Sequence, residues 1–186
     1  ESVKKLAMQQ TDIQATNGLG CFNDMDMLVV GMGGKGNVGL SGCTFEEYRT
    51  HFSLWAILNS PLIIGCDIRN MSEETKSILM NPGVLAVNQD PAARQPYQVG
   101  GTNECPIWAK LLANGDFALG CFNLSDTEAI PFFSLADMGL SRVCGKTLAL
   151  TDLWTGESVR MPNDMLRVPL QPHDCRMFRA KVVGAR

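Results

Sequence analysis

The chain has 186 residues, of which 45% are hydrophobic and 19% charged, and its formal net charge is −3. This composition is typical of a soluble globular protein, and the scattered lysines and arginines argue against nucleic acid as a partner. No apolar run approaches the roughly 20 residues that cross a bilayer, so the sequence predicts no membrane partner either.

The seven cysteines are odd in number, widely spaced and never arranged as a C-x-x-C pair. This pattern disfavours both a disulfide framework and a zinc site, and nothing else in the sequence predicts a metal or a cofactor. We expect the cysteines to be mostly small buried hydrophobic residues in a reducing compartment, which favours a cytoplasmic location. Because the sequence opens at Glu1 in mid-pattern, an upstream signal peptide and secretion stay open.

The first 43 residues predict a helix, a turn and a strand. Residues 1–10 carry apolar side chains at helical spacing, which is typical of the end of an amphipathic helix. A turn at 17–20 is followed by an apolar strand, Cys21–Val30. The next segment, Gly31–Gly42, is a glycine-rich loop.

Thr44 begins the most strongly predicted helix. Glu47 follows three residues later, the spacing of a capping box, and aromatic side chains then recur at steps of three and four. Pro61 must end this helix, because proline lacks an amide donor and disfavours helical geometry in the residue before it.

A second strand and helix follow. Leu62–Cys66 reads as a buried strand, and Ser72 is a good N-cap for a helix that the 81–83 segment ends. Asp67 and Arg69 follow the strand and could either pair to fix the loop, which we favour, or reach the rim of the site. Alternating strands and helices are the signature of parallel βα units, but two units cannot close a sheet with both faces covered. A doubly wound sheet or an eight-stranded barrel would need strands that precede Glu1, so we expect 1–96 to be an incomplete domain.

The pattern changes near residue 97. Two apolar runs, Ile107–Leu112 and Phe117–Phe122, flank an Asn114-Gly115 pair, which is a strong hairpin signal. Further short strands are expected at Ala129–Phe133, Thr147–Leu150, Ser158–Met161, Leu166–Leu170 and Cys175–Val183. This spacing predicts an antiparallel β-sandwich over 97–186.

The stretch from Asn23 to Met27 contains two carboxylates, Asp24 and Asp26. In a strand they would lie on one face, roughly 7 Å apart, a separation that suits the acid and base of an inverting glycosidase. The alternative is that one of them forms a turn or anchors a buried hydrogen bond.

Four ordered blocks resemble the α-galactosidases of glycoside hydrolase family 27. They are Gly20–Leu28, Leu54–Ile57 with Ser60-Pro61-Leu62, Asp67–Arg69 and Asn88–Pro91, and their order matches the last two βα units of that family's (β/α)8 TIM barrel. The rest of the chain resembles the family's C-terminal β-sandwich more loosely. The fold class implied is therefore α/β plus all-β: the end of a barrel (1–96) followed by an antiparallel sandwich (97–186).

The resemblance also implies a function. Family members hydrolyse terminal α-linked galactose with retention, using one aspartate as nucleophile and another as acid/base. Both precede the Asn23 block, so we assign no catalytic residue here and expect the chain alone to be inactive. Asp26 matches the family's carboxylate for galactose hydroxyls, and Met27 packs beside the sugar. Phe22 and Met25 depart from the family's usual Trp and Pro. The expected partners are an α-galactoside substrate and either the missing N-terminal half of the barrel or a second copy.

Other candidates are weaker. The glycine-rich loop lacks the G-K-[ST] ending of a phosphate cradle, and His51 and His173 are expected in core or surface roles. Trp108 and Trp154 are expected in the core. If they instead formed an exposed platform, the rival function of a non-catalytic carbohydrate-binding or interaction module would be favoured.

Overall fold

The computed structural model describes residues 2–35 and 42–185. The helices are α1 (Val3–Gln9), α2 (Phe45–Ile57), α3 (Glu73–Leu79) and α4 (Pro82–Asn88), with short 3-10 helices at Gln10–Asp12, Gln14–Thr16, Ile68–Asn70, Leu135–Met138 and Arg142–Cys144. The strands are β1 (Tyr97–Gly101), β2 (Pro106–Leu111), β3 (Phe117–Phe122), β4 (Phe132–Ser134), β5 (Lys146–Asp152), β6 (Ser158–Arg160), β7 (Met165–Arg167) and β8 (Cys175–Gly184). The middle of the predicted glycine-rich loop lies outside the described residues.

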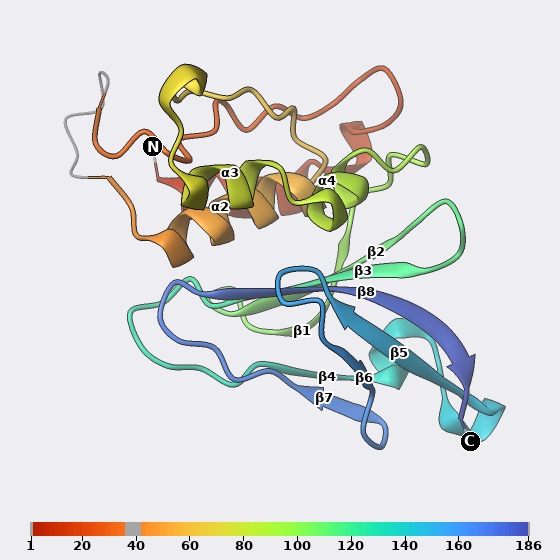
Figure 1. The fold of residues 1–186 in the computed structure, drawn as a ribbon. Helices are drawn as coiled ribbons and strands as arrows, with labels where there is room; N and C mark the ends of the chain where they lie inside the picture. The colour runs from red at the N-terminus through yellow and green to blue at the C-terminus, as the bar shows by residue number, and fades with distance from the viewer. Residues whose placement is uncertain (1, 36–41, 186) are drawn as a thin grey trace.

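Three layers are stacked in this structure (Figure 1). Helices α2, α3 and α4 lie over one face of a six-stranded sheet with the order β1-β2-β3-β8-β5-β6, and the pair β4-β7 lies on its other side. All strand pairs in both sheets are antiparallel. The predicted antiparallel sandwich is therefore confirmed, with a second layer of two strands.

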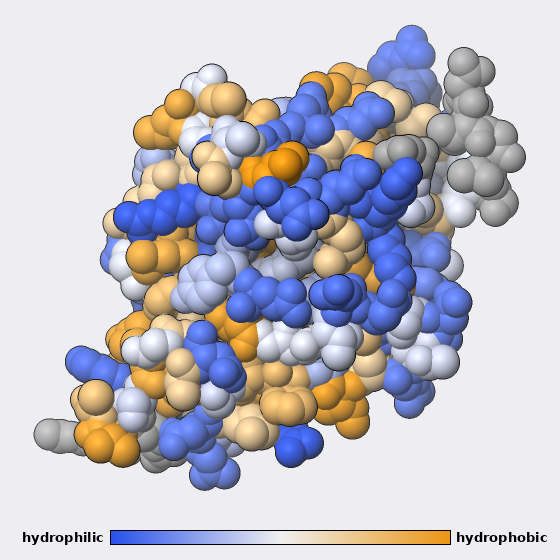
Figure 2. All heavy atoms as spheres, turned by 180° about the vertical axis from the view of Figure 1, so that it is seen from behind, coloured by the Kyte–Doolittle hydropathy of each residue, from blue (hydrophilic) through white to orange (hydrophobic). Residues whose placement is uncertain are grey.

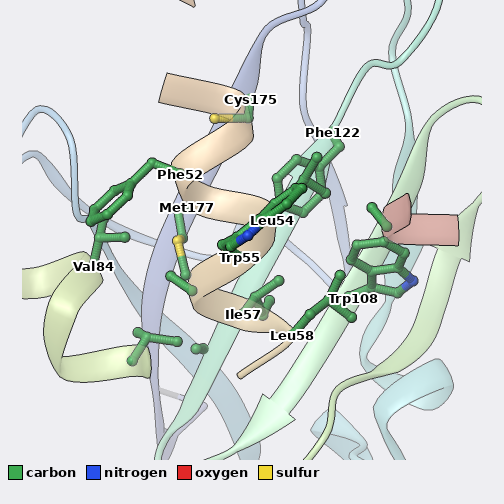
Figure 3. Close-up of a cluster of buried hydrophobic side chains, with 14 of the residues drawn as sticks. Phe52, Leu54, Trp55, Ile57, Leu58, Val84, Trp108, Phe122, Cys175 and Met177 are labelled. Carbon is green, nitrogen blue, oxygen red and sulfur yellow. The ribbon is translucent and has the colours of Figure 1, made fainter. Parts of the chain in front are cut away.

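One hydrophobic core joins the helices to the large sheet (Figure 3). Phe52 and Trp55 of α2 pack with Trp108, Phe122 and Met177 from the sheet. The approach is close at Gly120, where an added Cβ would lie 2.8 Å from Cδ1 of Ile57. Because this core spans both halves of the chain, the division after residue 96 stays a prediction.

A second core fills the space between the two sheets. Strand side chains alternate between the faces of a sheet, so Ile107 and Leu119 point away from the helices and pack with Phe133 of β4 and Leu148 of β5. The large sheet is thus covered on both faces.

The helix predictions hold where local signals are strong. Thr44 and Glu47 form the predicted capping box at the start of α2, and Ser72 caps α3 by accepting from the amide of Thr75. The structure adds a helix that was not predicted, α4. Asn81 caps it and Pro82 occupies its first turn, so the segment read as a helix stop also starts the next helix.

The two predicted barrel strands are the main correction to the expected fold. Cys21–Val30 and Leu62–Cys66 are not regular strands, but they meet at one parallel bridge between Leu28 and Ile64. The amide of Leu28 donates to Ile63 at 2.8 Å, and that of Gly65 donates to Leu28 at 3.0 Å. A barrel strand is paired along its length on both sides, whereas in the described residues these two segments share one bridge, and the other bridge of the first segment joins Cys21 to Gly18.

The prediction that the cysteines are mostly buried is wrong. Cys121 and Cys175 are buried, whereas Cys21, Cys43 and Cys144 are exposed. Cys21 and Cys43 lie outside the helices and strands, and Cys144 ends a short 3-10 helix on the surface.

None of the helices in the described part of the chain combines the length and apolar character that a membrane-spanning helix needs.

Candidate functional site

The carboxylates predicted to share a strand face instead form a turn. Asp24 Oδ1 accepts a hydrogen bond from the amide of Asp26 at 2.8 Å, and Asp26 has a left-handed backbone with φ of 74°. The expected strand geometry is therefore wrong, and Asp24 forms a turn, as the alternative reading of this stretch had it.

Groups from α2 and the segment after it hold this turn. The indole Nε1 of Trp55 donates to the backbone oxygen of Asp26 at 2.8 Å, and the amide of Met25 donates to Ser60 Oγ at 2.9 Å. A non-glycine residue in the left-handed region costs on the order of 1–3 kcal/mol unless its surroundings enforce it. The buried side chains of Met25 and Trp55 supply that enforcement.

The turn presents a carboxylate beside an apolar side chain. Asp26 is exposed, and its Oδ1 accepts from the amide of Met27 at 2.6 Å, whereas Oδ2 accepts no hydrogen bond from the described residues. Met27 is 39% exposed and lies over Gly65, where an added Cβ would be 2.7 Å from its sulfur. An open acceptor next to an apolar contact suits a polyhydroxylated ligand, which offers hydroxyl donors and C–H surface together.

His51 lies behind this turn in the core. It is buried, its Nε2 accepts from the amide of Val29 at 3.1 Å, and its ring meets Trp55 edge-on with centroids 4.0 Å apart. Burial lowers the pKa of His51 from its ordinary 6.5 to about 3. The histidine therefore stays neutral and structural, and its predicted core role is confirmed.

This burial predicts a loss of stability in acid. Because the folded protein resists protonating His51, the unfolded state binds more protons between about pH 3 and 6.5, and the free energy of unfolding falls as pH falls through that window. His51→Gln keeps an acceptor for Val29 without the titration. Urea unfolding at pH 7 and pH 4 should show a smaller loss for this variant than for the wild type. Equal losses would contradict the assignment.

The other aromatic candidates do not form a binding platform. Trp108 is 1% exposed, and the half-buried Trp154 packs toward α2, where its Nε1 donates to Ser53 Oγ at 3.1 Å. Both contribute to the core that joins the sheet to the helices, as predicted.

The remaining candidates make polar contacts at the surface. His173 contacts Asp126, which fits its predicted surface role. Arg69 donates to both carboxylate oxygens of Asp67, at 2.9 Å each, and the side-chain bond holds the pKa of Asp67 below its ordinary value. This is the pairing expected for the loop. No cluster of metal-ligating side chains occurs within residues 2–35 and 42–185.

A buried lysine that the sequence did not single out connects the two halves of the chain. Lys110 of β2 is completely buried, and its Nζ donates to Asn59 Oδ1 and, at 2.6 Å, to the backbone oxygen of Val87. Burial lowers its pKa to about 8, against the opposing effect of the Asp90 carboxylate. The sequence does carry one signal for this residue, because Lys110 is a cation within a predicted strand whose neighbouring residues are apolar.

The chain thus combines a helical segment, which carries one parallel bridge and a polar turn, with an antiparallel sandwich packed against it. Two family models match the chain: residues 1–90 match "Alpha galactosidase A" and residues 102–180 match the "Alpha galactosidase C-terminal beta sandwich domain". The chain belongs to the α-galactosidases of glycoside hydrolase family 27 and corresponds to their C-terminal region.

Known proteins resemble the chain over most of its length. An α-galactosidase of Cyamopsis tetragonoloba is 37% identical over 161 residues, which are 87% of this chain and 37% of that protein. A putative α-galactosidase/melibiase structure from Bacteroides fragilis has a TM-score of 0.87 at 30% identity, covering 97% of this chain and 39% of that one. A family 27 β-L-arabinopyranosidase structure from Geobacillus stearothermophilus has a TM-score of 0.81 at 29% identity, covering 95% and 42%. The chain thus spans well under half the length of these relatives.

Proposed function

We propose that this chain is part of a retaining α-galactosidase, in which it supplies a sugar-binding turn and the β-sandwich but neither catalytic carboxylate. Asp26 accepts hydrogen bonds from galactose hydroxyls, and Met27 packs against the sugar. The observation that carries the proposal is the exposed carboxylate of Asp26 on a turn that the core holds in a left-handed conformation.

The turn performs positioning rather than bond making. In a retaining mechanism one carboxylate attacks the anomeric carbon and the other first protonates the leaving oxygen and then activates water. Asp24 Oδ1 accepts a hydrogen bond from the amide of Asp26, which gives Asp24 a structural role in the turn. Asp26 orients the sugar for groups supplied by the rest of the barrel, and such orientation lowers the entropy cost of the reaction.

An exposed apolar surface supports association with the rest of a barrel. Large hydrophobic side chains are exposed on the barrel-type half: Ile13, Leu19, Phe22, Met27, Phe45, Ile63, Ile64, Ile68 and Met80. Seen from behind relative to Figure 1, the surface shows hydrophobic groups intermixed with hydrophilic ones (Figure 2). Side chains of this kind next to an incompletely paired parallel bridge are expected to be covered by the preceding barrel strands.

Two sugars fit a carboxylate acceptor of this kind. The relatives named above include α-galactosidases and a β-L-arabinopyranosidase. We favour the α-galactoside, because both family models that match the chain are α-galactosidase models.

A rate assay tests the proposal that this chain contributes to sugar binding but supplies no catalytic carboxylate. The purified chain should not hydrolyse an aryl α-galactoside above the background rate, because both catalytic carboxylates lie in the part of the barrel it does not contain. A complete protein carrying this segment should hydrolyse the aryl α-galactoside faster than the aryl β-L-arabinopyranoside. Turnover by the chain alone that Asp24→Asn abolishes would contradict the proposal.

A further inference from the structure

Lys110 lies at the meeting point of the sandwich and the barrel-type half. It belongs to β2, and its ammonium group reaches Asn59, which follows α2, and Val87, which lies in α4. Val87 is near the end of α4, where helix carbonyls lack an intrahelical donor, so Lys110 satisfies an acceptor that would otherwise be buried and unpaired.

Asn59 is itself constrained from both ends of its amide. Its Oδ1 accepts from Lys110, and its Nδ2 donates to the backbone oxygen of Arg94 at 2.9 Å. Its backbone is left-handed, with φ of 56°. The side chain is buried, so the two hydrogen bonds fix how the chain turns after α2.

The residue after Asn59 contacts the candidate site directly. Ser60 Oγ accepts from the amide of Met25, and the Ser60 amide donates to Trp55, whose indole binds the backbone oxygen of Asp26. The Ser60 backbone oxygen also accepts from Asn88 Nδ2 at 2.9 Å. The hydrogen bonds of Lys110 to Asn59 and of Ser60 to Met25, joined by the peptide bond between Asn59 and Ser60, therefore connect the sandwich to the turn that carries Asp26.

We infer that Lys110 is a positioning residue: by fixing Asn59 and the Trp55–Ser60 segment, it holds the Met25–Asp26 turn in its left-handed, sugar-binding form. The sandwich thereby contributes to the geometry of the site without touching the ligand. The importance of Lys110 for catalysis rests on the proposed function of Asp26, whereas the structural coupling between Lys110 and the turn does not.

Amide hydrogen exchange in the purified chain tests the coupling without any sugar. The reference is the amide of Leu119 in the middle of β3, which reports opening of the large sheet. In Lys110→Met the exchange rate of the Met25 amide, divided by that of the Leu119 amide, should rise about tenfold over the wild type. Loss of the Lys110 hydrogen bonds should let the turn open more often without an equal increase in the opening of the sheet.

Thr50→Val is the matched control. It removes a different hydrogen bond between the halves, from Thr50 Oγ1 to the backbone oxygen of His173, at 2.8 Å. The Met25-to-Leu119 ratio should stay at its wild-type value in this variant. An equal rise in both variants, or no rise in Lys110→Met, would show that Lys110 only stabilises the interface and would overturn the inference.

Asn59→Gly covers the case in which Lys110→Met does not fold. Glycine keeps the positive φ and removes the acceptor for Lys110, so the same tenfold rise is expected. An unchanged ratio in Asn59→Gly would overturn the inference. If the ratio rises but Asp26 proves irrelevant to the sugar, the coupling stands and only the proposed function fails.

Discussion

Asp26→Asn should lower kcat/KM for an aryl α-galactoside between about tenfold and a hundredfold in a complete protein containing this segment. Hydrogen bonds to a charged acceptor are worth roughly 1.5–3 kcal/mol, and asparagine replaces a carboxylate oxygen by a donor that a hydroxyl hydrogen cannot bind. Asparagine also tolerates the left-handed conformation that Asp26 adopts, so the turn should survive. Steady-state kinetics and the thermal midpoint should be measured together.

Asp24→Asn is the control two residues away. Its side-chain oxygen can still accept from the amide of Asp26, so kcat/KM is expected to stay within about threefold of the wild type. A folded Asp26→Asn variant with unchanged kcat/KM, or an equal loss in both variants, would remove the sugar contact assigned to Asp26.

Phe122→Ala should destabilise the chain by about 3–5 kcal/mol, the usual cost of removing a buried aromatic side chain. Phe122 is fully buried between the large sheet and α2, and its ring lies 5.5 Å from that of Trp108. For a protein of this size the midpoint of thermal unfolding should fall on the order of 10 °C. Both the helical and the sheet signals in circular dichroism should be lost in one transition, because one core serves both layers.

Phe132→Ala provides the same substitution on the surface. Phe132 is 50% exposed and its ring faces the guanidinium of Arg167 at 5.6 Å. Its loss should cost under about 1 kcal/mol. Similar destabilisation by both substitutions, or separate helical and sheet transitions, would contradict a shared core.

The parts of the fold that could be predicted are those encoded by neighbouring residues. The capping box of α2 needs only Thr44 and Glu47, and the hairpin between β2 and β3 needs only the Asn114-Gly115 turn between apolar runs. The missed helix α4 also has local signals, but Asn81-Pro82 both follows one helix and caps the next. Sequence alone does not show whether Asn81-Pro82 only ends one helix or also begins another.

The parts that could not be predicted depend on distant residues. Cys21–Val30 is apolar enough for a strand, yet a strand needs neighbours, and its described partner meets it at Leu28 alone. The left-handed backbone of Asp26 is likewise enforced by Trp55 and Ser60, more than 25 residues further along.

The family resemblance selected Asp26 and Met27, whereas their physical setting came only from the structure. Spacing alone favoured neither Asp26 nor Asp24, since both were expected on one strand face. Lys110 carried a faint signal, because a strand with apolar residues on both faces should be covered on both. The tertiary contacts are needed to show that α2 and α4, and not a second sheet, cover this face of β2.

A crystal structure of the complete protein with bound galactose tests the central claim most directly. We predict a galactose hydroxyl within about 3.2 Å of a carboxylate oxygen of Asp26, with the Met27 side chain against the sugar and no sugar on the sandwich. Galactose bound only on the sandwich, or held in the barrel without contact to Asp26, would contradict the role proposed for this turn.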